Sequence, residues 1–183
     1  SGKKIKIVKI FLKNYCEIEK YMILYRCGKE IFCYTYLFII TKGGFTMIKI
    51  HIGLKGSGKT KKIIDDVNKA VSAEKGNVVC ITEGDRLIHD IDRSVRLVNT
   101  EQFDIKNFDM FTGMLCGIIA QDFDVTHIFI DSVFKSVPKA DMSNIDELIT
   151  ALERLEKKFD VSFTLMISAD TSEATELTKK YMD

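Results

Sequence analysis

From Met47 onward the chain alternates short, β-rich apolar runs with longer segments whose apolar residues recur at helical spacing. Runs rich in Val, Ile and Phe predict strands, because β-branched and aromatic side chains suit a pleated and buried surface. Five strands are predicted, at residues 47–52, 77–82, about 95–98, 125–131 and 161–168.

Four helices are predicted between and after these strands. Residues 59–74 carry an apolar stripe that ends at Lys75-Gly76, and residues 108–121 are mostly apolar and predict a largely buried helix. Residues 143–159 open with a Ser-Asn-x-Asp-Glu start, and a last helix is expected at about 172–181. Strands that alternate with helices are typical of an α/β domain with a mainly parallel central sheet, here of about five strands.

The first 46 residues have a different composition. They contain five of the six tyrosines and three of the five cysteines, but no Asp, Ala, Pro, Gln or His. Their commonest residue types have codons rich in A and T, as expected for translated non-coding DNA of that composition. Lys42-Gly43-Gly44 is also compatible with a purine-rich ribosome-binding site placed shortly before Met47.

We therefore interpret residues 1–46 as a non-native upstream translation, with Ser1-Gly2 left from a tag, and residues 47–183 as the native domain. The alternative is a genuine extension in which residues 30–40 form an added strand or hairpin on the sheet edge. An apolar segment of this kind also offers a route to a dimer, because exposed strands pair readily with copies of themselves.

Charge and cysteine usage exclude several classes of function. Residues 1–46 carry a net charge of +6, which leaves −5 of the overall +1 for residues 47–183. An acidic body argues against nucleic-acid binding. The five cysteines are scattered without a C-x-x-C pair and indicate neither a disulfide framework nor a zinc site. The longest apolar run, residues 31–41, is shorter than the roughly 20 residues of a membrane helix. We expect a cytoplasmic protein with no membrane contact.

Residues 53–60, Gly-Leu-Lys-Gly-Ser-Gly-Lys-Thr, match the phosphate-loop (Walker A) pattern G-x-x-x-x-G-K-[ST] between a predicted strand and a predicted helix. Glycines let backbone N–H groups turn towards phosphates at a helix N-terminus, which favours anions. Lys59 is expected to reach the β- and γ-phosphates during catalysis, and the Thr60 hydroxyl to ligate Mg²⁺. The predicted nucleotide-binding residues are Gly53, Gly56, Ser57, Gly58, Lys59 and Thr60.

The strand predicted at residues 125–131 ends in Asp131, which is placed to hold Mg²⁺ through a water. Hydrolysing proteins of this kind carry a general-base Glu at the next position, which here is Ser132. Substitute catalytic groups are Glu83, after the 77–82 strand, and Asp170, after the last strand. Ser168 and Asp170 would sense the γ-phosphate if the last strand lies between the phosphate-loop strand and the Asp131 strand. ATP is the expected nucleotide, because the N-K-x-D motif that reads guanine is absent.

Two further features have a functional and a structural interpretation. Arg86, Arg93 and Arg96 would clamp phosphate or a substrate, or pair with the aspartates of their own segment on the surface. His127 lies within a predicted strand, and we expect a structural rather than a catalytic histidine.

On these motifs, residues 47–183 resemble small bacterial phosphate-loop ATP-binding proteins, some of which are labelled twitching-motility ATPases. The motif order, which ends in Ser168-Ala169-Asp170, is also similar to that of thymidine kinase and other RecA-like proteins. The resemblance implies a three-layer α/β/α P-loop NTPase fold of the RecA-like type. Thymidine kinases have a Glu after the strand-end Asp and a zinc-bound cysteine lasso, whereas this sequence has Ser132 and no such cysteines.

The sequence supports three functional hypotheses. The first is an ATP-binding protein with weak or partner-dependent NTPase activity, a hydrolase in which Mg²⁺ and ATP operate a switch for a protein partner. The second is a small-molecule kinase with a nucleoside-like acceptor near residues 86–96. The third is a non-catalytic interaction module that retains the phosphate loop.

Overall fold

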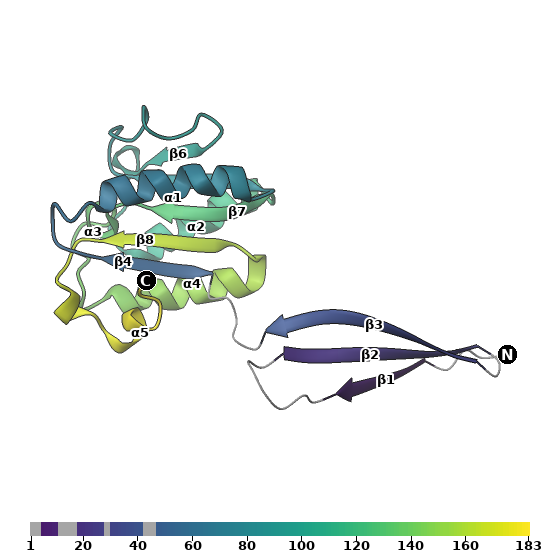
Figure 1. Cartoon of the computed structure of the whole chain (residues 1–183). Coiled ribbons are helices and arrows are strands. Elements are labelled where there is room, and N and C mark those ends of the chain that lie inside the picture. The colour runs from purple at the N-terminus through teal and green to yellow at the C-terminus, as the bar shows by residue number, and fades with distance from the viewer. Residues whose placement is uncertain (1–4, 11–17, 28–29, 42–46) are drawn as a thin grey trace. The chain divides into compact units, whose positions relative to one another are not determined.

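The computed structural model describes residues 5–10, 18–27, 30–41 and 47–183, and the chain falls into two compact units divided between Thr46 and Met47. The first unit is an antiparallel sheet of β1 (Ile5–Ile10), β2 (Ile18–Cys27) and β3 (Glu30–Thr41), in that order (Figure 1). β3 covers the strand considered for residues 30–40, and within this unit it pairs with β2.

The second unit contains a five-stranded sheet in the order β4-β8-β7-β5-β6, with every neighbouring pair parallel. The strands are β4 (Ile48–Ile52), β5 (Asn77–Thr82), β6 (Arg96–Asn99), β7 (Val125–Ile130) and β8 (Ser162–Ile167). The α-helices are α1 (Lys59–Ala73), α2 (Phe108–Gln121), α3 (Val133–Ser136), α4 (Ile145–Phe159) and α5 (Glu176–Lys179). Two 3₁₀ turns are η1 (Thr100–Gln102) and η2 (Thr171–Glu173). The predicted α/β fold with a parallel sheet of about five strands is confirmed.

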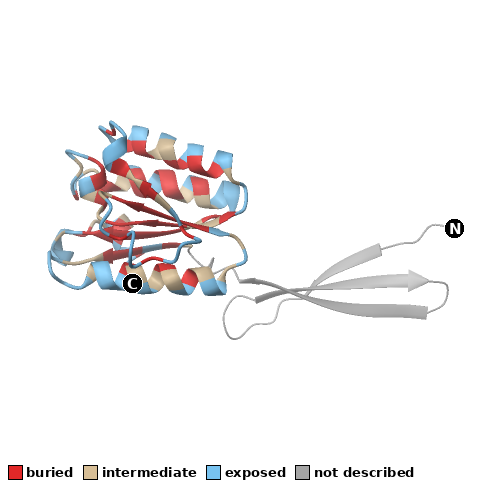
Figure 2. Cartoon of the chain, turned by 90° about the horizontal axis from the view of Figure 1, so that it is seen from above, coloured by how far each residue is buried: buried red, intermediate tan, exposed pale blue. Residues whose placement is uncertain are grey.

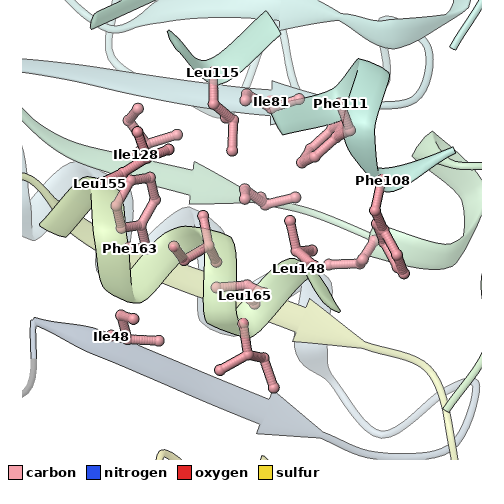
Figure 3. Close-up of a cluster of buried hydrophobic side chains, with 14 of the residues drawn as sticks. Ile48, Ile81, Phe108, Phe111, Leu115, Ile128, Leu148, Leu155, Phe163 and Leu165 are labelled. Atoms are coloured by element: carbon pink, nitrogen blue, oxygen red, sulfur yellow. The ribbon is translucent and has the colours of Figure 1, made fainter. Parts of the chain in front are cut away.

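Helices cover both faces of this sheet, which gives three layers with a buried centre (Figure 2). Successive strand residues point to opposite faces. Phe129 packs with α1 on one face, whereas its neighbours Ile128 and Ile130 pack with α2 and α4 on the other. Phe111 and Phe163 are fully buried in this larger cluster (Figure 3).

Helix boundaries follow local hydrogen bonds. α2 begins where predicted, because the Asn107 side chain accepts a hydrogen bond from Met110 N at 2.9 Å. The predicted start of the next helix at Ser143 is wrong by two residues. The Asp141 carboxylate accepts hydrogen bonds from the amide and hydroxyl of Ser143, which holds this segment in a turn before Ile145.

The helix predicted at residues 172–181 is also wrong in extent, since only η2 and the one-turn helix α5 form there. Thr175 starts α5 by accepting a hydrogen bond from Thr178 N. The chain then runs beside β4, where Ile50 N donates to Tyr181 O and Asp183 N donates to Ile50 O. The last residues thereby cover the outer edge of β4, an edge that would otherwise expose unpaired backbone groups.

The strand order places several chain segments together at the C-terminal ends of the parallel strands. β8 lies between β4 and β7, which meets the condition stated for Ser168. Because the strands are parallel, the segments that follow β4, β8, β7 and β5 all leave from the side of the sheet where the strands have their C-terminal ends. None of the helices in the described ranges is both long and apolar enough to cross a membrane.

Candidate functional site

The loop between β4 and α1 favours glycine at three positions, at two because of the backbone conformation and at one because of a close contact. Gly56 and Gly58 have φ angles of 89° and 85°, in the left-handed region that other residues rarely adopt. A Cβ atom on Gly53 would lie 2.6 Å from Ser57 Oγ, closer than non-bonded atoms pack. Gly53 N also donates to Ile167 O at 3.1 Å, which ties the start of the loop to the end of β8.

Lys59 is the first residue of α1, and its side chain turns back over this loop. Its Nζ donates to Gly53 O at 2.6 Å, to Leu54 O at 2.8 Å and to Ser57 Oγ at 3.3 Å. Burial lowers the pKa of Lys59 from its ordinary value, and the nearby charge of Asp131 opposes this effect. If an anion entered the loop, Lys59 Nζ would donate to charged oxygens in place of the neutral ones. Hydrogen bonds from an ammonium group are stronger when the acceptor is charged.

The N-terminus of α1 has no side-chain cap. Gly58 occupies the N-cap position, and no side chain caps the helix there. The first N–H groups of a helix have no intrahelical acceptor, and they carry a partial positive charge. The exposed Thr60 side chain belongs to the same turn.

Asp131 follows β7 and is 2% exposed. Its amide donates to Ile81 O at 2.8 Å, which continues the pairing of β7 with β5 for one residue. Arg86 Nη2 donates to Asp131 Oδ2 at 2.5 Å and to Ser132 Oγ at 2.9 Å. Ser132 Oγ in turn donates to Asp131 Oδ1 at 3.2 Å. Both oxygens of this buried carboxylate thus have partners from the chain itself.

Ser132 has a positive φ of 55° and starts the short helix α3. Such a backbone is uncommon for residues other than glycine, and strain of this type often occurs at functional sites. The side chain at the position of the expected general base is a hydroxyl held between Arg86 and Asp131. It offers no carboxylate to polarise a water.

These groups line one open pocket with a volume of ≈ 460 Å³, within the range of about 300–1,000 Å³ that is usual for small-ligand sites. The loop and the first turn of α1 contribute Lys55, Gly56, Gly58, Lys59 and Thr60. The other walls consist of Arg86, Asp131, Ser132, Lys135 and Ser168. Four basic side chains and one carboxylate make this pocket complementary to a ligand with several negative charges.

Two of the predicted catalytic residues lie outside this pocket lining. Glu83 Oε2 lies 3.4 Å from Lys135 Nζ, so it forms an ion pair with a residue of the pocket wall. The Asp170 carboxylate accepts hydrogen bonds from Ser172 N at 2.8 Å and Ser172 Oγ at 2.7 Å, and these bonds lower its pKa. Asp170 therefore caps η2, while Ser168 is the residue of this segment that reaches the pocket.

The arginine cluster does not act as a unit. Arg86 lines the pocket, whereas the Arg96 side chain donates a hydrogen bond to Gln121. The sequence reasoning missed Lys55 and Lys135 as site residues. Lys135 was detectable, because it follows Asp131 by four residues, about one helical turn.

His127 has the structural surroundings expected from its place in a strand. Its Nδ1 lies 2.7 Å from Glu74 Oε1, its Nε2 lies 2.9 Å from Thr164 Oγ1, and its ring stacks on Phe129. Burial lowers its pKa, and the hydrogen bond to Glu74 opposes that shift. His127 does not line the pocket formed by Lys59, Thr60 and Asp131.

Cys80 is buried, and burial raises the pKa of its thiol to about 12, so that it remains a neutral, unreactive group. Across the part of the chain that the structure describes, no cluster of three or more His, Cys, Asp or Glu side chains is arranged to hold a metal ion.

Neither a known protein-family profile nor a curated protein sequence matches this chain.

Proposed function

We propose that this protein binds a magnesium–nucleoside triphosphate, with ATP as the default, and uses it as a switch with slow or partner-dependent hydrolysis. The observation that carries the proposal is the arrangement of residues 53–60 between β4 and α1, facing Asp131 across a pocket of ≈ 460 Å³. The motif and its strand-to-helix setting agree, which is what makes a phosphate-loop pattern specific.

The local geometry supports phosphate binding in particular. The left-handed Gly56 and Gly58 and the uncapped start of α1 leave backbone N–H groups free at a positive helix end. Lys59 is bound to neutral oxygens at the mouth of the loop, from which a short movement would take it to a phosphate. Lys55 and Lys135 add positive charge at the rim.

The residues present also fit Mg²⁺. Thr60 and Asp131 line the same pocket, and hydroxyl and carboxylate oxygens are ligands that Mg²⁺ prefers. Asp131 fits as a ligand once Arg86 releases it. When bound with the nucleotide, the ion would neutralise charge between the β- and γ-phosphates.

A RecA-like architecture is supported by β8, the additional strand between β4 and β7. Slow turnover follows from Ser132, which leaves the attacking water without a base at the usual place, and from Glu83, whose carboxylate is paired with Lys135. A protein that binds the nucleotide well but hydrolyses it slowly is suited to signal its bound state to a partner.

The test is calorimetric titration of the full chain with Mg-ATP, comparing the wild type with Lys59→Ala and Lys61→Ala. Both variants lose one lysine from the first turn of α1, but Lys61 is exposed and does not line the pocket. Lys59→Ala should remove detectable ATP binding and keep its helical circular dichroism, whereas Lys61→Ala should bind as the wild type does. ATP binding by Lys59→Ala at wild-type affinity would refute the proposal.

One observation favours the kinase alternative. A second pocket of ≈ 160 Å³ lies where β5 and β6 end, and it includes Thr82, Asp85, Asn99 and Gln102. Asp85 precedes Arg86 of the phosphate-loop pocket, so that an acceptor there would be near the phosphates. Transfer of labelled phosphate from ATP to an added nucleoside would select this alternative, and nucleotide binding without turnover or response to partners would select the non-catalytic module.

A further inference from the structure

Arg86 occupies the carboxylate that a divalent cation would need. Its guanidinium lies 2.5 Å from Asp131 Oδ2, while Asp131 Oδ1 accepts a hydrogen bond from the hydroxyl of Ser132. Asp131 is 2% exposed, so a cation cannot approach it from another open side without displacing one of these partners. Two positive groups cannot share one buried carboxylate at close range without strong repulsion.

The backbone around Arg86 is anchored, whereas its side chain is partly exposed. Leu87 is 1% exposed and packs with α1, and Asp92 N donates to the side chain of Asn68 on that helix at 2.9 Å. The Arg86 side chain is 40% exposed and already forms part of the pocket wall. A change of rotamer would carry the guanidinium from Asp131 into the pocket without movement of the segment.

Arg86 also changes the electrostatic interaction of the pocket with phosphate. With the guanidinium in place, the negative charge of Asp131 is neutralised, and the other charged side chains of the pocket lining are basic. Without it, a buried carboxylate would face the phosphates and repel them unless a cation intervened. An arginine suits this exchange because its charge persists at all relevant pH values and its planar donors bind carboxylates and phosphates alike.

We propose that Arg86 competes with the divalent cation for Asp131, so that the pocket accepts a phosphate chain without a cation and binds free cation only weakly. The inference rests on the proposed function for the phosphate ligand, but the competition for Asp131 stands on the ion pair alone. In the metal-bound complex, Arg86 leaves Asp131 and donates to the phosphates.

The first experiment uses Mn²⁺ without nucleotide, followed by electron paramagnetic resonance on the full chain. Arg86→Gln should bind Mn²⁺ about tenfold more tightly than the wild type, the change that corresponds to removing one charge-assisted hydrogen bond. Adding Asp131→Asn to that variant should abolish the gain. Arg154→Gln is the matched control, because Arg154 is an exposed arginine of α4 away from the pocket lining. Equal Mn²⁺ affinity in Arg86→Gln and the wild type would overturn the proposal.

The second experiment compares ATP affinity in excess EDTA and in excess Mg²⁺. The wild type should bind metal-free ATP within about tenfold of Mg-ATP, whereas in Arg86→Gln the ratio of the two dissociation constants should rise about tenfold further. Arg86→Lys, which keeps the charge, should stay near the wild-type ratio. A wild type that needs Mg²⁺ for any binding, or a ratio unaffected by Arg86→Gln, contradicts the inference.

Failure of the proposed function has a different signature. In that case the wild type binds ATP neither with nor without Mg²⁺, and the Mn²⁺ measurement alone decides whether Arg86 and a cation compete for Asp131. Circular dichroism of each variant establishes that the helices have formed before either comparison.

Discussion

Replacing glycine by alanine should have opposite effects at Gly58 and Gly113. At Gly58 the added methyl group has no atom within 4 Å, so the cost comes only from the φ of 85°. A left-handed backbone costs a residue with a Cβ roughly 1–2 kcal/mol. The lower entropy of the unfolded chain returns about 0.4–1 kcal/mol of this. Gly58→Ala should therefore reduce the free energy of unfolding by about 1 kcal/mol.

Gly113 lies in the interior of α2, and a Cβ there also meets nothing within 4 Å. Alanine favours a helix over glycine by about 0.8–1 kcal/mol. Gly113→Ala should thus raise the free energy of unfolding by about 1 kcal/mol, and the two variants should differ by about 2 kcal/mol. At about 2–4 °C for each kcal/mol in a domain of this size, their melting temperatures should lie about 4–8 °C apart.

The assay is thermal and urea unfolding without nucleotide, followed by circular dichroism at a helical wavelength. All the α-helices that the structure describes belong to residues 47–183, so this signal reports on the second unit. Equal stability of the two variants, or a Gly58→Ala protein more stable than the wild type, would show that residue 58 does not need a left-handed backbone.

The remaining predictions concern a cap and a partly buried histidine. Asp170→Ala should lower the urea midpoint of unfolding, because it removes the acceptor of two Ser172 hydrogen bonds, and should leave the dissociation constant for Mg-ATP unchanged. A large loss of ATP affinity in that variant would instead restore Asp170 as a site residue. Burial lowers the pKa of His127 below its unfolded value of about 6.5, so at acidic pH the unfolded state binds more protons than the folded state. Stability from the neutral His127 is fully present above pH 6.5 and is lost as the pH falls below it. The difference in unfolding free energy between pH 7.5 and pH 5.5 should shrink in His127→Gln, and an unchanged difference would exclude His127 as a source of acid sensitivity.

Local pattern was enough to predict most elements of the second unit. The strand at residues 77–82 and the helix at 108–121 form within their predicted bounds, because each is strongly apolar. The expectation that this helix is largely buried was wrong, since only five of its 14 residues are buried. The prediction of one helix at residues 172–181 was wrong, because short polar side chains such as Asp170 and Thr175 accept hydrogen bonds from nearby backbone N–H groups. Such competition depends on geometry that a periodic pattern does not contain.

The sequence by itself determined the Walker A pattern of residues 53–60, its place between a strand and a helix, and the position of Asp131 at a strand end. These features depend on contiguous residues, and their backbone requirements are visible as glycines at particular spacings. Only the tertiary structure decided that Arg86 pairs with Asp131, that Lys135 enters the pocket, and that Glu83 does not line it. Those outcomes depend on the strand order, which brings the ends of β5 and β7 together, and on competition between side chains for the same charged partners.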